Sequence, residues 1–147
     1  MKSTCFSLQD GPHLQDARSR QSCGIIRDAN GTPQYVIVAG GRKHTKKKDA
    51  ILNSVEYLDL DEISKGWQKS NQHLPFHVER SVLVEDRMTN SLIMIGGQST
   101  NANHKLTSIY KLSDPLGSWE KQNYRLNHPR VGHVAMFIPN SLVTCKN

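Results

Sequence analysis

The residues best suited to chemistry in this chain are its histidines, its cysteines and a cluster of basic side chains. The cysteines form no CxxC pair, and no zinc-like spacing joins them to the histidines. No nucleophile elbow or phosphate-cradling glycine loop surrounds a serine, histidine or aspartate. We therefore expect a protein that is not an enzyme, with no metal site and no cofactor. The seven histidines are His13, His44, His73, His77, His104, His128 and His133, and the three cysteines are Cys5, Cys23 and Cys145.

Positive charge is concentrated in one short run. The formal net charge is +6, and five of the basic residues fall within seven positions: Arg42, Lys43, Lys46, Lys47 and Lys48. Nucleic-acid-binding segments usually interleave such charges with aromatic residues, whereas this run contains only His44 and Thr45 between them. A solvated loop is the favoured interpretation, so nucleic acid is not the expected partner. Electrostatic binding of nucleic acid or acidic lipid through residues 42–48 is the alternative.

The N-terminal residues, the length of the apolar runs and the number of cysteines indicate a cellular location. Residues 1–15 include no apolar stretch of signal-peptide type, and no apolar run is long enough to cross a membrane. An odd number of cysteines indicates reduced thiols. We expect a protein of the cytoplasm or nucleus without a membrane partner.

An internal repeat runs through the chain. The stretch YVIVAGG at 35–41 returns as SLIMIGG at 91–97, and each is followed by a polar loop and a strand-like run. A lone tryptophan and then an arginine before a further apolar run follow in both copies. The matched residues are Gly40 and Gly41 with Gly96 and Gly97, Tyr57 with Tyr110, Trp67 with Trp119, and Arg80 with Arg130, while Arg20 takes the arginine position before the first glycine pair.

The elements that must position these residues are short strands. Each unit contains four segments of strand length bounded by Gly, Pro, Asn and Asp, and no helical periodicity of useful length occurs. The sequence therefore predicts an all-β protein. Four consecutive strands repeating near ~50 residues are typical of a β-propeller blade.

In this order of arginine, glycine pair, tyrosine and tryptophan, the chain resembles the kelch-repeat family over nearly its whole length. The resemblance implies an incomplete kelch-type propeller with two full four-stranded blades, at 20–72 and 80–124. Residues 1–14 would supply the last strand of a preceding blade, and residues 130–147 the first two strands of a following blade. Fewer than three blades cannot close a ring. We expect flanking repeats missing from a truncated chain, and the alternatives are self-association or a marginally stable open arc.

The repeat residues have structural roles in such a blade. Glycine pairs allow a positive φ and close backbone approach, and the tyrosines and tryptophans fill space between blades. Binding is expected in the loops. In an antiparallel meander, the loops after the second and fourth strands share one end of the blade, and the basic run and the three arginines lie in or beside these loops. The arginines either bind acidic groups of a partner or hold the loops through internal salt bridges or backbone hydrogen bonds.

The function that follows from the resemblance is a protein-interaction module. Kelch proteins include substrate-recognition portions of ubiquitin-ligase adaptors and actin-binding proteins. The expected ligand is a protein or an acidic peptide segment. The candidate binding residues are Arg20, Arg42, Lys43, Lys46, Lys47, Lys48, Arg80 and Arg130.

Overall fold

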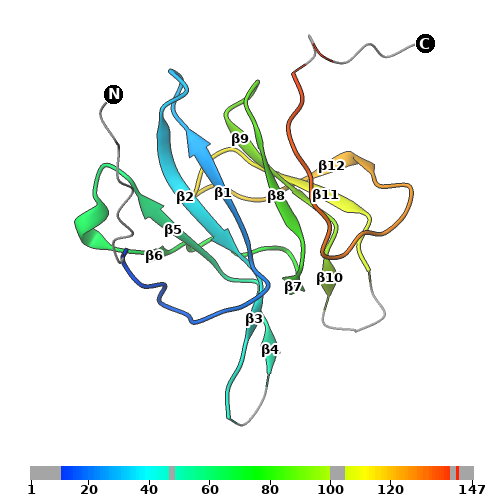
Figure 1. Cartoon of the computed structure of the whole chain (residues 1–147), viewed down its shortest axis with the longest axis horizontal. Coiled ribbons are helices and arrows are strands. Elements are labelled where there is room, and N and C mark those ends of the chain that lie inside the picture. The colour runs from blue at the N-terminus through cyan, green and yellow to red at the C-terminus, as the bar shows by residue number, and fades with distance from the viewer. Residues whose placement is uncertain (1–10, 47–48, 100–104, 140–141, 143–147) are drawn as a thin grey trace, which may run out of the picture.

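The computed structural model describes residues 11–46, 49–99, 105–139 and 142 (Figure 1). Within these residues the chain is built from β-strands and one 3-10 turn, η1 (Ile63–Lys65), which confirms the all-β class. No helix in the described part is long and apolar enough to span a bilayer.

Two four-stranded antiparallel sheets form the body of the molecule. The first has the order β1-β2-β5-β6 and the second the order β12-β11-β9-β8, so both run through the chain as meanders. The first sheet consists of β1 (Ser22–Arg27), β2 (Pro33–Ala39), β5 (Val55–Asp59) and β6 (Gln68–Lys69). The second consists of β8 (Val82–Asp86), β9 (Ser91–Ile95), β11 (Ser108–Leu112) and β12 (Glu120–Arg125).

Two small ribbons extend from one end of these sheets. β3 (Arg42–Lys43) pairs with β4 (Ala50–Ile51), and β7 (Val78–Glu79) pairs with β10 (Gln98–Ser99). In Figure 1 both ribbons lie below the main sheets, and the β1–β2 and β8–β9 hairpins point away from them. The second ribbon belongs with the second sheet, because β7 directly precedes β8 and β10 directly follows β9.

The β1–β2 and β8–β9 hairpins are closed by the same device. The Asp28 carboxylate accepts the backbone N–H groups of Asn30 and Thr32, at 2.9 and 2.8 Å. The Asp86 carboxylate accepts the N–H of Met88 at 3.0 Å. Aspartate side chains stabilise tight turns in this way, so local chemistry fixes where these strands end.

The main core lies between the two sheets, where β1 packs against β8 and β9. Gly24 of β1 makes this approach possible, because a Cβ there would lie 2.5 Å from Leu92 Cδ2 of β9. Strand glycines often mark such close contacts. The buried residues of this core include Ile37, Val55, Leu83, Met94, Tyr110, Leu112 and Trp119.

The hydrogen bonds correct the predicted match between Tyr57 and Tyr110. Gly40 donates to the Ser54 carbonyl and Gly96 donates to the Ser108 carbonyl, so Ser54 and Ser108 are equivalent. Tyr110 then corresponds to the residue before Tyr57. A shift of one residue turns a side chain to the other face of a sheet. When the two sheets are matched strand by strand, the face that carries Tyr57 therefore does not correspond to the face that carries Tyr110.

The tryptophans do occupy matching positions. Gln68 pairs with Tyr57, and Glu120 pairs with Lys111, the equivalent of Tyr57, so Trp67 and Trp119 precede equivalent residues. Trp119 is buried in the core. The Trp67 indole donates to the Pro12 carbonyl at 3.0 Å.

The outer units differ from the predicted strands. Residues 11–14 form no strand, and residues 1–10 lie outside the described part. Residues 130–139, where another strand was predicted, are irregular, although the exposure of 133–138 alternates. Val134, Met136 and Ile138 are 89%, 75% and 50% exposed. The second predicted strand of that unit falls mostly on residues outside the described part.

Candidate functional site

One end of the two sheets gathers most of the predicted binding residues, and we call it the arginine face. It comprises Arg20, the β3–β4 ribbon, Glu79, Arg80 and Arg130. The glycine pairs build this end. Gly41 (φ 94°) donates its N–H to the Val78 carbonyl at 2.8 Å, and Gly97 (φ 99°) donates to the Arg130 carbonyl at 2.8 Å. The positive φ at each pair brings the first sheet's loops against the second unit, and the second sheet's loops against residue 130.

A buried carboxylate organises the centre of this face. Glu79 is 1% exposed and accepts two hydrogen bonds from Arg42, from Nε at 2.9 Å and from Nη2 at 2.7 Å. Arg20 adds a third from Nη1 at 3.3 Å. These bonds, with that to Arg42 foremost, lower the pKa of the Glu79 carboxyl, and Glu79 raises the pKa of Arg42. Arg42 is thus committed to an internal bidentate pair.

Lys43, the next residue of the basic run, is also paired internally, and so is His44. Lys43 lies 2.7 Å from Asp16, and Asp49 lies 3.7 Å from Arg42 and 3.0 Å from His44. Hydrogen bonds from Lys43 and then Lys69 lower the pKa of Asp16 from 3.8 to about 2. Three carboxylates therefore offset the charge of this hairpin.

Some predicted binding residues remain available. Lys46 is exposed, and it forms no ion pair with any other described residue. Lys47 and Lys48 lie outside the described residues. The unpaired charge of the described hairpin is thus limited to its tip.

Arg20 and Arg80 are neighbours with the same backbone conformation. Both have a φ of 56°, and the Arg80 N–H donates to the Arg20 carbonyl at 2.9 Å. Gly132, with a φ of 62°, donates in the same way to the Arg80 carbonyl at 2.9 Å. The third residue of this series is therefore Gly132 and not Arg130. Non-glycine residues rarely adopt this left-handed conformation, so it holds the arginines at a defined place.

The side chains of this series differ in availability. Arg20 is 41% exposed in its side chain although it contacts Glu79. Arg80 and Arg130 are exposed, and neither has an ion-pair partner within the described part of the chain. Arg130 takes the place that Val78 holds in the preceding unit, since both carbonyls receive a glycine N–H. The face thus holds one neutralised cluster and two free guanidinium groups.

Sequence reasoning missed Glu79, and it also missed a second buried carboxylate. Glu56 of β5 is fully buried and pairs with Arg18, whose side chain is also fully buried. The backbone N–H groups of Gln15 and Asp16 donate to the same carboxylate at 2.7 and 3.1 Å. The only signal in the sequence was a charged residue among the apolar residues of β5.

His133 is a polar group without a partner in the described structure. Both ring nitrogens are buried and make no hydrogen bond. Burial, and next the charge of Arg130, lower the pKa of His133, so the ring is neutral near pH 7. The ring lies beside Gly96, where a Cβ would come 3.0 Å from its Cε1.

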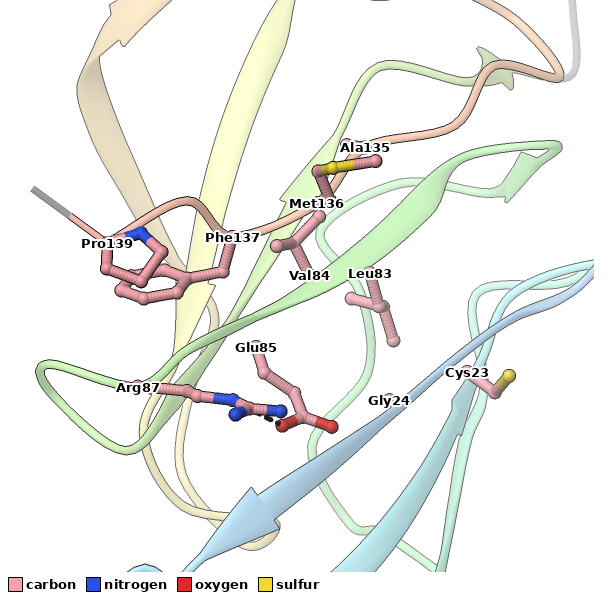
Figure 2. Close-up of a pocket in the computed structure, with 10 residues that line it drawn as sticks. All are labelled: Cys23, Gly24, Leu83, Val84, Glu85, Arg87, Ala135, Met136, Phe137 and Pro139. Carbon is pink, nitrogen blue, oxygen red and sulfur yellow. Dashed lines mark ion pairs between the residues drawn. The ribbon is translucent and has the colours of Figure 1, made fainter. Parts of the chain in front are cut away.

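A cavity of about 440 Å³ opens between β1, β8 and residues 135–139 (Figure 2). Cys23 and Gly24 line it from β1, and the C-terminal segment adds Met136 and Phe137. Figure 2 shows Glu85 and Arg87 together at one side, and this pair is 3.7 Å apart. The described residues contain no group of three side chains able to hold a metal ion. The cavity is a cleft with both apolar and charged walls, and it lies beside residues 135–139, which form no strand.

No family model and no curated protein matches this chain. Among solved structures, one described as "Structure of YjhT" matches with a TM-score of 0.62 at 12% identity. The match covers 78% of this chain and 40% of the chain in that structure. The present chain therefore spans well under two thirds of the length of the protein it matches. At this identity the likeness concerns the fold alone.

Proposed function

We propose that this chain is part of a kelch-type β-propeller that acts as a non-catalytic protein-interaction module in the cytoplasm or nucleus. Two successive four-stranded meanders packed face to face support the propeller, as do the matched glycine pairs and tryptophans. The resemblance to kelch adaptors extends the proposal to the substrate-recognition portion of an adaptor.

The ligand in this proposal is an acidic segment of another protein, bound at the arginine face. The observation that carries it is the state of Arg80, which is exposed and unpaired among the described residues beside the partly exposed Arg20. Guanidinium groups bind carboxylates in bidentate geometry. Glu79 holds Arg42 and contacts Arg20, so the base of the face is organised before a ligand arrives.

The pairing within the basic run favours peptide recognition over general binding of polyanions. Asp16, Asp49 and Glu79 offset the charges of Arg42 and Lys43, which leaves a weaker field than the sequence implies. A ligand must then be recognised by a few placed arginines and not by a continuous basic stripe.

Selection from a peptide library followed by affinity measurement tests the proposal. We expect a selected acidic peptide to bind, and a scrambled peptide of equal charge to bind weakly. Arg80→Ala should weaken binding about tenfold, since a charge pair at an interface centre is lost. Arg87→Ala, which removes an exposed arginine from the opposite end, is the matched control. Equal affinity for arbitrary polyanions, with steep loss in high salt, would replace this proposal with the electrostatic alternative.

We further propose that additional four-stranded units cover residues 130–139 beside the second sheet, from flanking repeats or from another copy of the chain. The exposed Val134 and Met136 support this, because apolar surface of this kind usually has a partner. Light scattering of the 147-residue chain tests it. A monodisperse monomer with a sharp unfolding transition would contradict it.

A further inference from the structure

A second cavity lies at the opposite end of the sheets from the arginine face. Its volume is about 200 Å³, and both four-stranded sheets bound it. Tyr35 of β2 and Tyr57 and Asp59 of β5 line one side. The β11–β12 turn, with Asp114, lines the other.

The wall formed by that turn is fixed in place. The Ser70 hydroxyl, which is buried, donates to the Pro115 carbonyl at 3.0 Å and so ties the turn to the first sheet. The Asp114 carboxylate accepts the Leu116 N–H at 2.7 Å, and the Gly117 N–H donates to the Asp114 carbonyl at 2.9 Å. The cavity is therefore preformed.

Two aromatic rings line the cavity, and Pro115 and Leu116 add further apolar surface. Tyr35 and Tyr57 have ring centroids 6.1 Å apart and planes at 81°. The Tyr57 hydroxyl donates to Gln68 Oε1 at 3.1 Å, which fixes that ring. Aromatic ring faces attract cations, and pairs of perpendicular rings suit a cation surrounded by methyl groups.

The charge of the cavity is negative. Three carboxylates line it against one ammonium, and that ammonium, on Lys65, is held by Glu62 at 2.6 Å. Neither Asp59 nor Asp114 forms an ion pair with a described residue, and each accepts only a backbone N–H of its own turn. Their charge reaches the rings, because the pKa of Tyr35 is raised first by burial and then by Asp59 and Asp114.

The carboxylates do not converge as metal ligands do. No group of three histidine, cysteine, aspartate or glutamate residues in the described chain could hold a metal ion. Divalent cations need several oxygen ligands at short range. The ligand class that remains is an organic cation.

We propose that this cavity binds a methylated ammonium group, carried by a small molecule or by a methylated lysine side chain. The tyrosine rings contact its methyl groups, and Asp59 and Asp114 balance its charge across the junction of the two sheets. This site is independent of the arginine face.

Calorimetric titration of the full chain with choline tests the proposal, with 3,3-dimethyl-1-butanol as the neutral isostere. We expect saturable choline binding and about tenfold weaker binding of the alcohol, because only choline carries the charge that ring faces and carboxylates attract. A peptide with trimethyllysine separates the two sources: tighter binding than choline assigns the site to a protein side chain, and weaker binding to a free cation.

Variants locate the binding. Asp114→Asn and Tyr57→Leu should each weaken choline binding several-fold, whereas Tyr57→Phe should retain it. Asp86→Asn is the matched control, since Asp86 caps the β8–β9 turn as Asp114 caps its own. If Tyr57→Leu lowers the thermal midpoint, Asp59→Asn at the end of β5 takes its place. Equal binding of the neutral alcohol, no saturation by choline, or an equal effect of Asp86→Asn would overturn the proposal. Arg80→Ala should leave choline binding unchanged, which separates this test from that of the arginine face.

Discussion

The Glu56 carboxylate and the Arg18 guanidinium form an ion pair in which neither side chain has exposed surface. Glu56 lies on the face of the first sheet that points away from Gly24 and the second sheet, because strand residues alternate between faces. With the N–H groups of Gln15 and Asp16 on the same carboxylate, the pair fixes residues 15–18 across that outer face. A charged contact thus covers the side of the first sheet that no other sheet covers in the described structure.

Glu56→Gln should lower the free energy of unfolding by about 3 kcal/mol, because it removes the nearest partner of the buried Arg18 charge and leaves only Asp16, at 3.9 Å. Urea denaturation measures this. The control is Glu62→Gln, which breaks an exposed pair with Lys65 and should cost about 0.5 kcal/mol or less. An equal cost of both variants would contradict the assigned role of Glu56.

Gly41→Ala should destabilise the fold more than Gly31→Ala, although both glycines have a positive φ. A Cβ at Gly41 would lie 2.7 Å from the Ser19 carbonyl oxygen, whereas a Cβ at Gly31 would meet nothing within 4 Å. Gly31→Ala should therefore cost only the conformational term of about 1 kcal/mol. Gly41→Ala should add about 1–3 kcal/mol for the collision with backbone. Thermal melting of the two variants side by side decides it, and similar midpoints would refute the close approach at Gly41.

Tyr110→Ala should cost about 3–5 kcal/mol, since a large core side chain is removed. Tyr110 is 8% exposed and its ring centroid lies 5.1 Å from that of Phe76. Tyr57→Ala should cost clearly less, because Tyr57 is only half-buried and borders a cavity. Denaturant titration compares them. Equal costs would favour the equivalence that the sequence suggested over the observed register.

Stability should fall as the pH falls from 3.8 towards 2, because Asp16 titrates in this window. The folded-state pKa of Asp16 is about 2 against an ordinary value of 3.8, so its contribution is complete above pH 3.8 and disappears as the folded carboxyl is protonated. Asp16→Asn should flatten this part of the stability profile. Asp61→Asn, at an exposed aspartate that forms no ion pair with a described residue, should leave it unchanged. An unaltered slope in Asp16→Asn would show that its pairs with Lys43 and Lys69 do not form in solution.

The parts of the fold that follow from local chemistry could be read from the sequence. Alternating apolar runs and turn residues gave the strands of both sheets, and the double glycines marked where each second strand ends. The two tryptophans were matched correctly because each follows a short turn that holds its register.

Register and charge pairing could not be read in the same way. Tyr57 and Tyr110 were aligned by residue identity, but the hydrogen bonds from Gly40 to Ser54 and from Gly96 to Ser108 make those two serines equivalent, which shifts the match by one residue. Arg130 was aligned by identity as well, two positions before Gly132. Glu56 and Glu79 were missed because their partners are 38 and 37 residues away in the chain, at Arg18 and Arg42.

The series of backbone hydrogen bonds from Gly132 to Arg80 and from Arg80 to Arg20 has a direction. Each unit donates an N–H to the unit before it, so the two ends of the series are chemically different: a donor group at Arg20 and an acceptor group at Gly132. Any unit that extends this array, whether a flanking repeat or a second molecule, must join head to tail. A copy that met its own equivalent surface would bring donor against donor or acceptor against acceptor. An array extended from either end would therefore be polar, and only a ring or another terminating unit would end it.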